Sequence, residues 1–201
     1  MKREVKPEIL DSLPADDVEA VRSRKDLRLI NGLMGNERWI LRQKLTGRVV
    51  ELGAGAGTLA KKLAKNHEVT GLDFQEKPEG VEADWVAGDL FTVLPEVDGE
   101  TVVANLILHH FDDEALADLG KLLKGRRRLV AVEPWRSRLS LFEGRLLWPL
   151  INRVTRHDMM VSIRAGFQKG ELPDLLNLGE EWEWREEVSL LGGIRVVAWR
   201  P

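Results

Sequence analysis

The stretch VVELGAGAG, residues 49–57, decides the fold class of this chain. An apolar run ends at the acidic Glu51, and three glycines follow at every second position, namely Gly53, Gly55 and Gly57. In an open parallel sheet, a glycine loop between the first strand and the first helix lets a ligand lie against the backbone. The stretch therefore predicts a ligand site at the carboxyl end of a strand over residues 48–52.

Strand-like and helix-like segments alternate after this loop. Alternation of this kind predicts βαβ units, right-handed crossovers and a parallel sheet. The expected strands cover residues 48–52, 68–74, 83–90, 101–108 and 127–134, and a helix follows the loop and another covers residues 112–125. The C-terminal segment differs, because two extended runs flank Gly192-Gly193, which predicts an antiparallel hairpin at the sheet edge. Trp182 and Trp184 are expected to share a face of this hairpin in the core.

Residues 1–45 are expected to form an N-terminal helical cap on an α/β domain of residues 46–201. Asp16 with Glu19 has the spacing of a capping box, and Gly35 is expected to end that helix. Asn36 can then cap a second helix through Leu45. Within the domain, an insertion over residues 136–180 carries an apolar stripe of helical period, divided at Pro149. Such a stripe more often forms core or a dimer contact than a substrate pocket.

Composition limits the classes of partner. The chain has 201 residues, of which 43% are hydrophobic, enough for one ordinary core. Its net charge of −3 provides no broad positive surface, so nucleic acid is not an expected partner. The absence of cysteine excludes disulfides and thiolate metal sites, and no metal is expected. A charged N-terminus without an apolar signal segment indicates a cytoplasmic protein without stable membrane insertion.

Three ligand classes compete for the glycine loop. A nucleotide P-loop needs Gly-Lys-Ser/Thr, but Gly57 is followed by Thr58 and Leu59. A dinucleotide loop has the spacing G-x-G-x-x-G, from which this loop departs. Glu51 also disfavours a pyrophosphate, whereas it suits the ammonium and sulfonium of S-adenosylmethionine. Asp73, Asp89 and Asn105 end the next three strands, in positions suited to the ribose, the adenine and the amino acid end of that ligand.

These motifs resemble those of the class I S-adenosylmethionine-dependent methyltransferases. The matching stretches, in order, are VVELGAGAGTLAKKLA, VTGLDF, VAGDL, NLILHHF and LVAVEPWR, within about residues 46–136, together with the terminal hairpin. The resemblance implies a Rossmann-like, doubly wound, mostly parallel seven-stranded sheet with an antiparallel last strand and helices on both faces. S-adenosyl-L-methionine would be the cofactor and S-adenosyl-L-homocysteine the product. The implied cofactor-binding residues are Glu51, Gly53, Ala54, Gly55, Gly57, Asp73, Phe74, Gly88, Asp89, Leu90, Asn105 and Leu106.

The methyl acceptor is expected to be a small molecule, with oxygen the favoured atom. Without cysteine, covalent cytosine methylation and radical chemistry are not available. The Pro-Pro-aromatic motif of amino-methylating DNA enzymes is also missing, because Asn105 is followed by Leu-Ile-Leu. A protein or C-methyltransferase, and a non-catalytic S-adenosylmethionine-binding regulatory module, remain as alternatives. The chain is expected to be a monomer or a homodimer.

A hydroxyl acceptor requires a base near the cofactor's methyl group. His109 and His110 follow the fourth strand and are the candidates, although a role in packing or capping is as well supported by the sequence. Residues 1–45 and 136–180 are expected to fold over the crevice as a lid. Arg153, Arg156 and His157 in that insertion are candidates for substrate contact, while surface ion pairs are the more ordinary role of such arginines.

Overall fold

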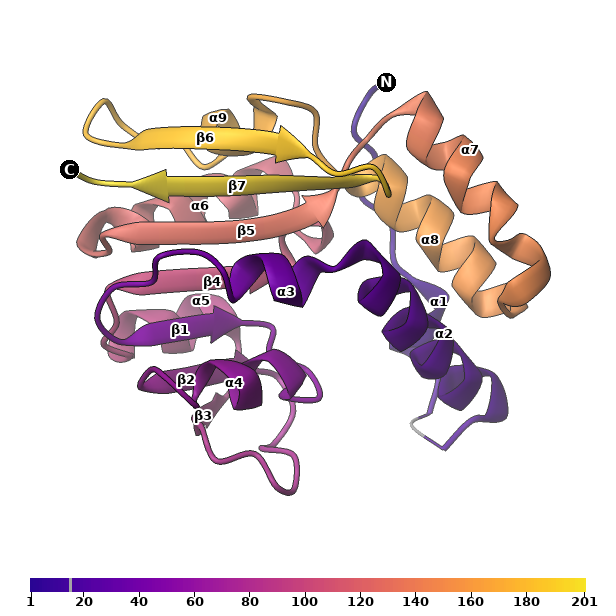
Figure 1. The fold of residues 1–201 in the computed structure, drawn as a ribbon, viewed down its shortest axis with the longest axis horizontal. Coiled ribbons are helices and arrows are strands. Elements are labelled where there is room, and N and C mark those ends of the chain that lie inside the picture. The colour runs from indigo at the N-terminus through magenta and orange to yellow at the C-terminus, as the bar shows by residue number, and fades with distance from the viewer. Residues whose placement is uncertain (15) are drawn as a thin grey trace.

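The computed structural model describes residues 1–14 and 16–201 and contains a sheet of seven strands in the order β3-β2-β1-β4-β5-β7-β6 (Figure 1). The strands are β1 (Val49–Leu52), β2 (Val69–Asp73), β3 (Asp84–Ala87), β4 (Thr101–Asn105), β5 (Arg128–Pro134), β6 (Glu183–Val188) and β7 (Gly193–Trp199). Strand β7 runs antiparallel to both of its neighbours, and the other pairs are parallel. The expected fold class and the terminal hairpin are thereby confirmed.

Helices cover both faces of the sheet. The α-helices of the described residues are α1 (Ile9–Ser12), α2 (Val18–Met34), α3 (Asn36–Ile40), α4 (Thr58–Leu63), α5 (Leu90–Val93), α6 (Asp113–Leu122), α7 (Arg138–Leu146), α8 (Arg153–Ala165) and α9 (Glu171–Leu175). One buried cluster joins the sheet to α5, α6 and α9 through residues such as Leu119 and Leu172. A second cluster joins the other face to α3 and α4 through Ile40 and Leu59. Alternating apolar strands and amphipathic helices bury these surfaces by the hydrophobic effect.

The strand order reverses between β1 and β4. Both strands run in the same direction, with Leu52 opposite Ala104, and each leads to a helix on a different face. Loops leaving the carboxyl ends of such neighbouring strands separate and open a crevice. The ligand site expected from the glycine loop therefore lies at the switch point of the sheet.

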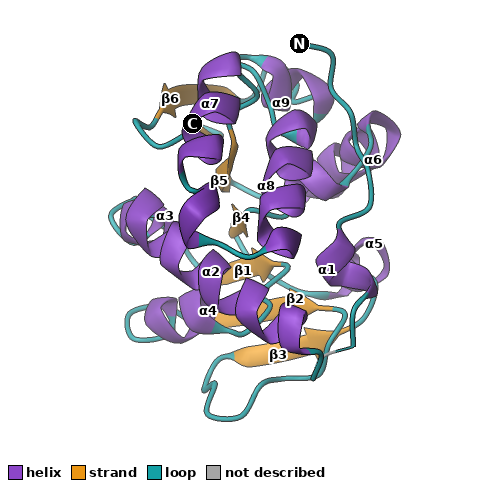
Figure 2. Ribbon diagram, turned by 90° about the vertical axis from the view of Figure 1, so that its right-hand side faces the viewer, coloured by secondary structure: helices purple, strands orange, loops and turns teal. Residues whose placement is uncertain are grey.

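Helices α1, α2, α7 and α8 lie beyond the carboxyl ends of the parallel strands (Figures 1 and 2). Segments far apart in sequence are joined there by polar contacts. Ser23 and Thr155 share a buried hydrogen bond of 2.8 Å between their hydroxyls. Asp158 accepts hydrogen bonds from the backbone N–H groups of Ile9 and Leu10, at 2.8 and 3.0 Å, and so caps α1. The N-terminal helices and the insertion thus form one layer over this end of the sheet.

Several boundaries differ from the sequence expectations. Asp17, and not Asp16, caps α2, because its carboxylate accepts from the N–H groups of Glu19 and Ala20. Helix α3 ends at Ile40, and its N-cap is Gly35. Trp182 is buried, but Trp184 is 42% exposed because it lies on the edge strand β6.

The cap and the insertion also contribute to the core. Ile40, from the expected cap, and Leu172 and Leu176, from the end of the expected lid, are buried against the sheet. The apolar stripe expected over α7 is not buried in the core: Leu139, Phe142 and Leu146 are exposed. Within the described residues, no helix combines the length and the apolar composition needed to cross a membrane.

Candidate active site

The glycine loop after β1 adopts a conformation that side chains would obstruct. Gly53 and Gly57 have positive φ angles of 61° and 68°. A Cβ at Gly53 would lie 2.7 Å from the side chain of Ile107, and one at Gly57 would lie 2.6 Å from Val81. At Gly55, φ is 53° and the nearest atom to such a Cβ is 4.0 Å away, so this position faces open space. The loop is therefore a backbone cradle that a ligand can approach closely.

Two acids at the next strand ends hold the loops that flank this cradle. Asp73 ends β2 and accepts hydrogen bonds from the N–H groups of Gly55, at 2.7 Å, and Gln75, at 2.9 Å. Asp89 follows β3 and caps α5 through Oδ1, which accepts from the N–H groups of Phe91 and Thr92. Both carboxylates keep further lone pairs, so a structural role does not prevent them from accepting a ligand's hydroxyl or amino group.

The remaining expected cofactor residues surround this edge of the sheet. Phe74 is exposed directly after Asp73, and the N–H of Gly88 donates to the carbonyl of Asp73 at 2.8 Å. Ala54, within the glycine loop, is buried. Leu90 is also buried, but it packs in the cluster beneath α5 and α6. Its side chain therefore serves the core, and only its backbone remains for a ligand.

Two buried polar atoms next to the cradle have no hydrogen-bond partner within the described part of the chain. They are Oε2 of Glu51, at the end of β1, and Oδ1 of Asn105, at the end of β4. Burial raises the pKa of Glu51 to about 8, with smaller contributions from Glu37 and Asp73. Buried polar atoms without partners are rare in native proteins. A ligand with an ammonium group and further donors would satisfy both atoms, which fits S-adenosylmethionine.

Leu106 connects the cradle to a larger cavity. Its φ angle is 60°, a left-handed conformation that is strained for a leucine, and its N–H donates to the carbonyl of Val132 at 2.8 Å. Strained backbone of this kind gathers at functional sites. The turn at Leu106 directs the chain away from the sheet, and both Leu106 and Asn105 line the larger cavity.

This larger cavity has a volume of about 560 Å³ and lies between the ends of β4 and β5 and helices α2, α7 and α8. Most of its surface is apolar, with a few polar groups, as is typical of small-molecule sites. It is lined by Glu8, Leu27, Ile30, Asn31, Leu33, Met34, Asn105, Leu106, His109, His110, Pro134, Ser140, Glu143, Gly144, Leu146, Leu147, Met159, Ser162, Ile163, Leu191 and Gly192. The N-terminal segment and the insertion thus form its walls.

His109 is fixed between two carboxylates at one side of this cavity. Its Nδ1 lies 2.7 Å from Oε2 of the fully buried Glu133, and its Nε2 lies 3.8 Å from Oε1 of Glu8. Burial alone would lower the pKa of His109, but the carboxylates of Glu133 and Glu8 outweigh it and raise the pKa to about 9. His109 is therefore an imidazolium at neutral pH.

His110 is the better candidate for a base. Its ring lies 4.3 Å from that of His109, between centroids, and it lines the cavity. Burial lowers the pKa of His110, and the charge of His109 lowers it further. His110 is therefore neutral at pH 7 and able to accept a proton, while His109 is not. The sequence placed both histidines at the site but did not separate their roles.

Three residues of this site were not expected from the sequence. Glu133 is the penultimate residue of the buried strand β5, as Glu51 is of β1, so the sequence pattern could have identified it. Glu8 accepts a hydrogen bond from the hydroxyl of Ser162, but it lies in a charged N-terminal stretch with no pattern that singles it out. Arg3 fixes that stretch by donating to the carbonyls of Ala165 and Phe111, at 2.8 and 2.6 Å.

The expected substrate residues of α8 lie elsewhere. Arg153 and His157 are exposed, and Arg156 donates through Nε to the carbonyl of Ile151 at 3.0 Å. His157 pairs with Asp158 at 2.9 Å. None of the three lines the larger cavity, because they occupy the helix face turned away from it; the α8 residues that do line it are Met159, Ser162 and Ile163.

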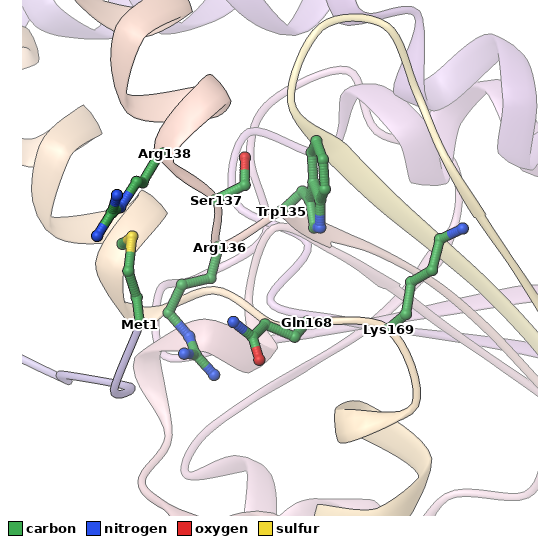
Figure 3. Close-up of a pocket in the computed structure, with 7 residues that line it drawn as sticks. All are labelled: Met1, Trp135, Arg136, Ser137, Arg138, Gln168 and Lys169. Atoms are coloured by element: carbon green, nitrogen blue, oxygen red, sulfur yellow. The ribbon is translucent and has the colours of Figure 1, made fainter.

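A second, more open cavity of about 510 Å³ follows the end of β5 (Figure 3). It is lined by Met1, Trp135, Arg136, Ser137, Arg138, Gln168 and Lys169. Arg136 is buried and pairs with Glu171, whereas Arg138 and Lys169 are exposed. Cationic side chains therefore gather at this second cavity, in contrast to the first.

Comparison with solved structures identifies the fold. The chain superimposes on a plantazolicin methyltransferase in complex with a triazolic desmethylPZN analog and SAH with a TM-score of 0.72, covering 95% of this chain and 92% of that one at 13% identity. The chain has the class I methyltransferase fold. The resemblance seen in the sequence motifs is thus confirmed in the architecture.

Two sequence relatives are plant O-methyltransferases. Over 103 residues the chain is 31% identical to cephaeline 6'-O-methyltransferase of Carapichea ipecacuanha, and over 117 residues it is 32% identical to tabersonine 16-O-methyltransferase of Catharanthus roseus. These regions cover 48% and 52% of this chain, and 28% and 30% of the relatives. The chain therefore matches less than a third of the length of either relative. No family model matches it.

Proposed function

We propose that this protein transfers a methyl group from S-adenosylmethionine to a hydroxyl group of a small molecule. The observation that carries the proposal is the position of Asn105. Its unpartnered Oδ1 is buried beside the glycine cradle, and the same residue lines the 560 Å³ cavity. A cofactor on the cradle and an acceptor in the cavity would therefore meet at Asn105. The similarity to plant O-methyltransferases supports oxygen as the acceptor atom.

The residues of the cradle would hold the cofactor by complementary charge and hydrogen bonding. Glu51 would accept from the ammonium of the amino acid end, which offsets the cost of burying its carboxylate. Asp73 would accept from the ribose hydroxyls and Asp89 from the adenine amino group. When bound, S-adenosylmethionine supplies a methyl carbon already activated by the adjacent sulfonium.

His110 would act on the acceptor. Because the reaction is an in-line displacement, the protein must align the hydroxyl and remove its proton. The neutral ring of His110 would take that proton as the oxygen attacks the methyl carbon. His109 would position His110 through their ring contact, and Glu133 holds His109 in place. Residues of α2, α7 and α8 would exclude water from the cavity.

Methyl transfer from labelled S-adenosylmethionine to a panel of small phenols and alcohols tests this function, with calorimetry of S-adenosylhomocysteine as the binding control. Labelled methyl ethers would support the proposal. Label transferred to peptides or to carbon would favour the protein or C-methyltransferase alternative. Tight cofactor binding without turnover on any acceptor class would favour a regulatory module.

A further inference from the structure

We infer that the acceptor carries a positively charged amine in addition to the hydroxyl that is methylated, and that Glu8 and Glu143 recognise this ammonium. The inference rests on the proposed function and adds the charge class of the substrate. It comes from the distribution of charged side chains around the larger cavity.

The larger cavity is lined by two carboxylates and by no lysine or arginine, as far as the chain is described. Glu8 enters from the N-terminal segment and Glu143 from α7. The second cavity has the opposite character, with Arg136, Arg138 and Lys169 in its wall. The two carboxylates outnumber the single imidazolium of His109 in the lining, so a carboxylate or phosphate on the acceptor would meet net repulsion in the larger cavity, whereas a cation would be attracted.

The positive charge of His109 does not fully compensate the negative charge of Glu8, because Glu133 shares it. Glu133 is negative and completely buried, and the imidazolium of His109 pairs with it at 2.7 Å. One positive charge cannot neutralise two carboxylates, so the Glu133–His109–Glu8 group carries a net negative charge. Glu8 has a side chain that is only 11% exposed. A buried charge that is only partly compensated is costly, and a cationic ligand in the cavity would relieve that cost.

The contacts of Glu8 leave one of its oxygens for a ligand. Both the hydroxyl of Ser162 and Nε2 of His109 approach Oε1. Across the described residues, no protein donor is assigned to Oε2. An ammonium hydrogen-bonded to that oxygen would form a charge-assisted hydrogen bond, which is about twice as strong as a neutral one.

A metal ion is the other cation that this group could attract, since ligand atoms of Glu8, His109 and His110 lie within 4.8 Å of one another. A metal requires a lone pair from each ligand, however. His109 could offer only Nε2, since its Nδ1 is engaged by Glu133, and Nε2 would first have to lose its proton. An ammonium needs only acceptor oxygens, so it fits the charge state of the site better.

The rest of the cavity defines the body of the substrate. Leucine, isoleucine and methionine side chains dominate the lining, including Leu27, Ile30 and Ile163. No aromatic ring other than those of the two histidines lines it in the described chain, so the ammonium would be held by carboxylates and not by an aromatic cage. The substrate is therefore a lipophilic hydroxylated amine.

Three matched phenols test the inference on the full chain loaded with S-adenosylhomocysteine. They are para-(dimethylaminoethyl)phenol, its neutral carbon isostere para-isopentylphenol, and the anionic para-hydroxyphenylpropanoate. We expect the amine to bind about tenfold more tightly than the neutral phenol, and the anion more weakly than either. In turnover with S-adenosylmethionine, kcat/KM should follow the same order. Equal affinities, or preference for the anion, would overturn the inference.

Two variants and one control assign the preference to its residues. Glu8→Gln and Glu143→Gln should each reduce the ratio of amine to neutral affinity severalfold, whereas Glu114→Gln on the exposed face of α6 should leave the ratio unchanged. A preference that appears only with added Zn²⁺ and disappears with a chelator would replace the ammonium by a metal and contradict the inference. Because affinity is measured separately from turnover, loss of the proposed methyl transfer and loss of the amine preference can be distinguished.

Discussion

Glu133 and His109 form a buried ion pair at the end of β5, with 2.7 Å between Oε2 and Nδ1. Glu133 also accepts hydrogen bonds from the backbone N–H groups of Ile107, Leu108 and His109, at 3.0, 2.8 and 3.2 Å. One carboxylate thus fixes both the turn after β4 and the charge state of the first histidine. The position of His110 in the cavity depends on that turn.

Replacing Glu133 should therefore destabilise the protein. The Glu133→Gln variant removes one charge of a buried pair and leaves the other without its partner, for which we expect a loss of about 3 kcal/mol in the free energy of unfolding. Urea denaturation of this variant and of the exposed control Glu114→Gln measures the difference. A loss no greater than that of the control would show that the pair does not hold the turn.

The same pair should make stability depend on pH. The pKa of His109 rises from 6.5 to about 9 on folding, so its stabilising contribution is complete below pH 6.5 and is lost as the pH rises through about 9. The free energy of unfolding should fall over this window in the native protein. The free energy of unfolding should fall less in His109→Gln, because this variant lacks the imidazole that titrates. Identical slopes for the two proteins would contradict the assigned charge of His109.

His110 should control the chemical step. His110→Ala should lower kcat by about 10²-fold or more, with little change in the affinity for S-adenosylhomocysteine. Because the pKa of His110 lies below its ordinary value of 6.5, the native kcat/KM should decline only at pH values below 6.5. The charged groups that act on this ring are His109, Glu8, Asp11 and Glu133. An unchanged kcat in the variant would assign His110 to packing.

Glu51 should release a proton when the cofactor binds. Its pKa of about 8 keeps the buried carboxyl largely protonated at pH 7, and an ammonium at Oε2 would favour the ionised form. Calorimetry of S-adenosylhomocysteine in buffers of different ionisation enthalpy should reveal this proton, and Glu51→Gln should abolish it. Binding without any buffer dependence would remove Glu51 from the cofactor site.

The parts of the site that can be predicted from the sequence are those that local sequence patterns determine. A buried strand followed by glycines at Gly53, Gly55 and Gly57 leaves few alternatives for the backbone, and acids at strand ends meet at one edge of a parallel sheet. The positions of Asp73, Asp89 and Asn105 are therefore predictable from the order of residues along the chain. The left-handed turn at Leu106 is not, because leucine has no preference for that conformation.

The parts of the site that could not be predicted from the sequence depend on contacts between distant segments. Glu8 reaches the cavity because Asp158 caps α1, a contact that spans most of the chain. The apolar stripe around Phe142 indicated a helix but not which of its faces would be covered. Arg153 and His157 share that helical insertion with Ser162, yet only tertiary packing decides which face of α8 meets the cavity.

Calorimetric titration with S-adenosylhomocysteine, NADH and ATP tests the central claim most directly, with Asp73→Ala as the matched variant. We predict that S-adenosylhomocysteine binds the native protein and that the variant loses about 1 to 3 kcal/mol of binding free energy through unpaired ribose hydroxyls. Binding of NADH or ATP in the absence of any heat from S-adenosylhomocysteine would contradict the account.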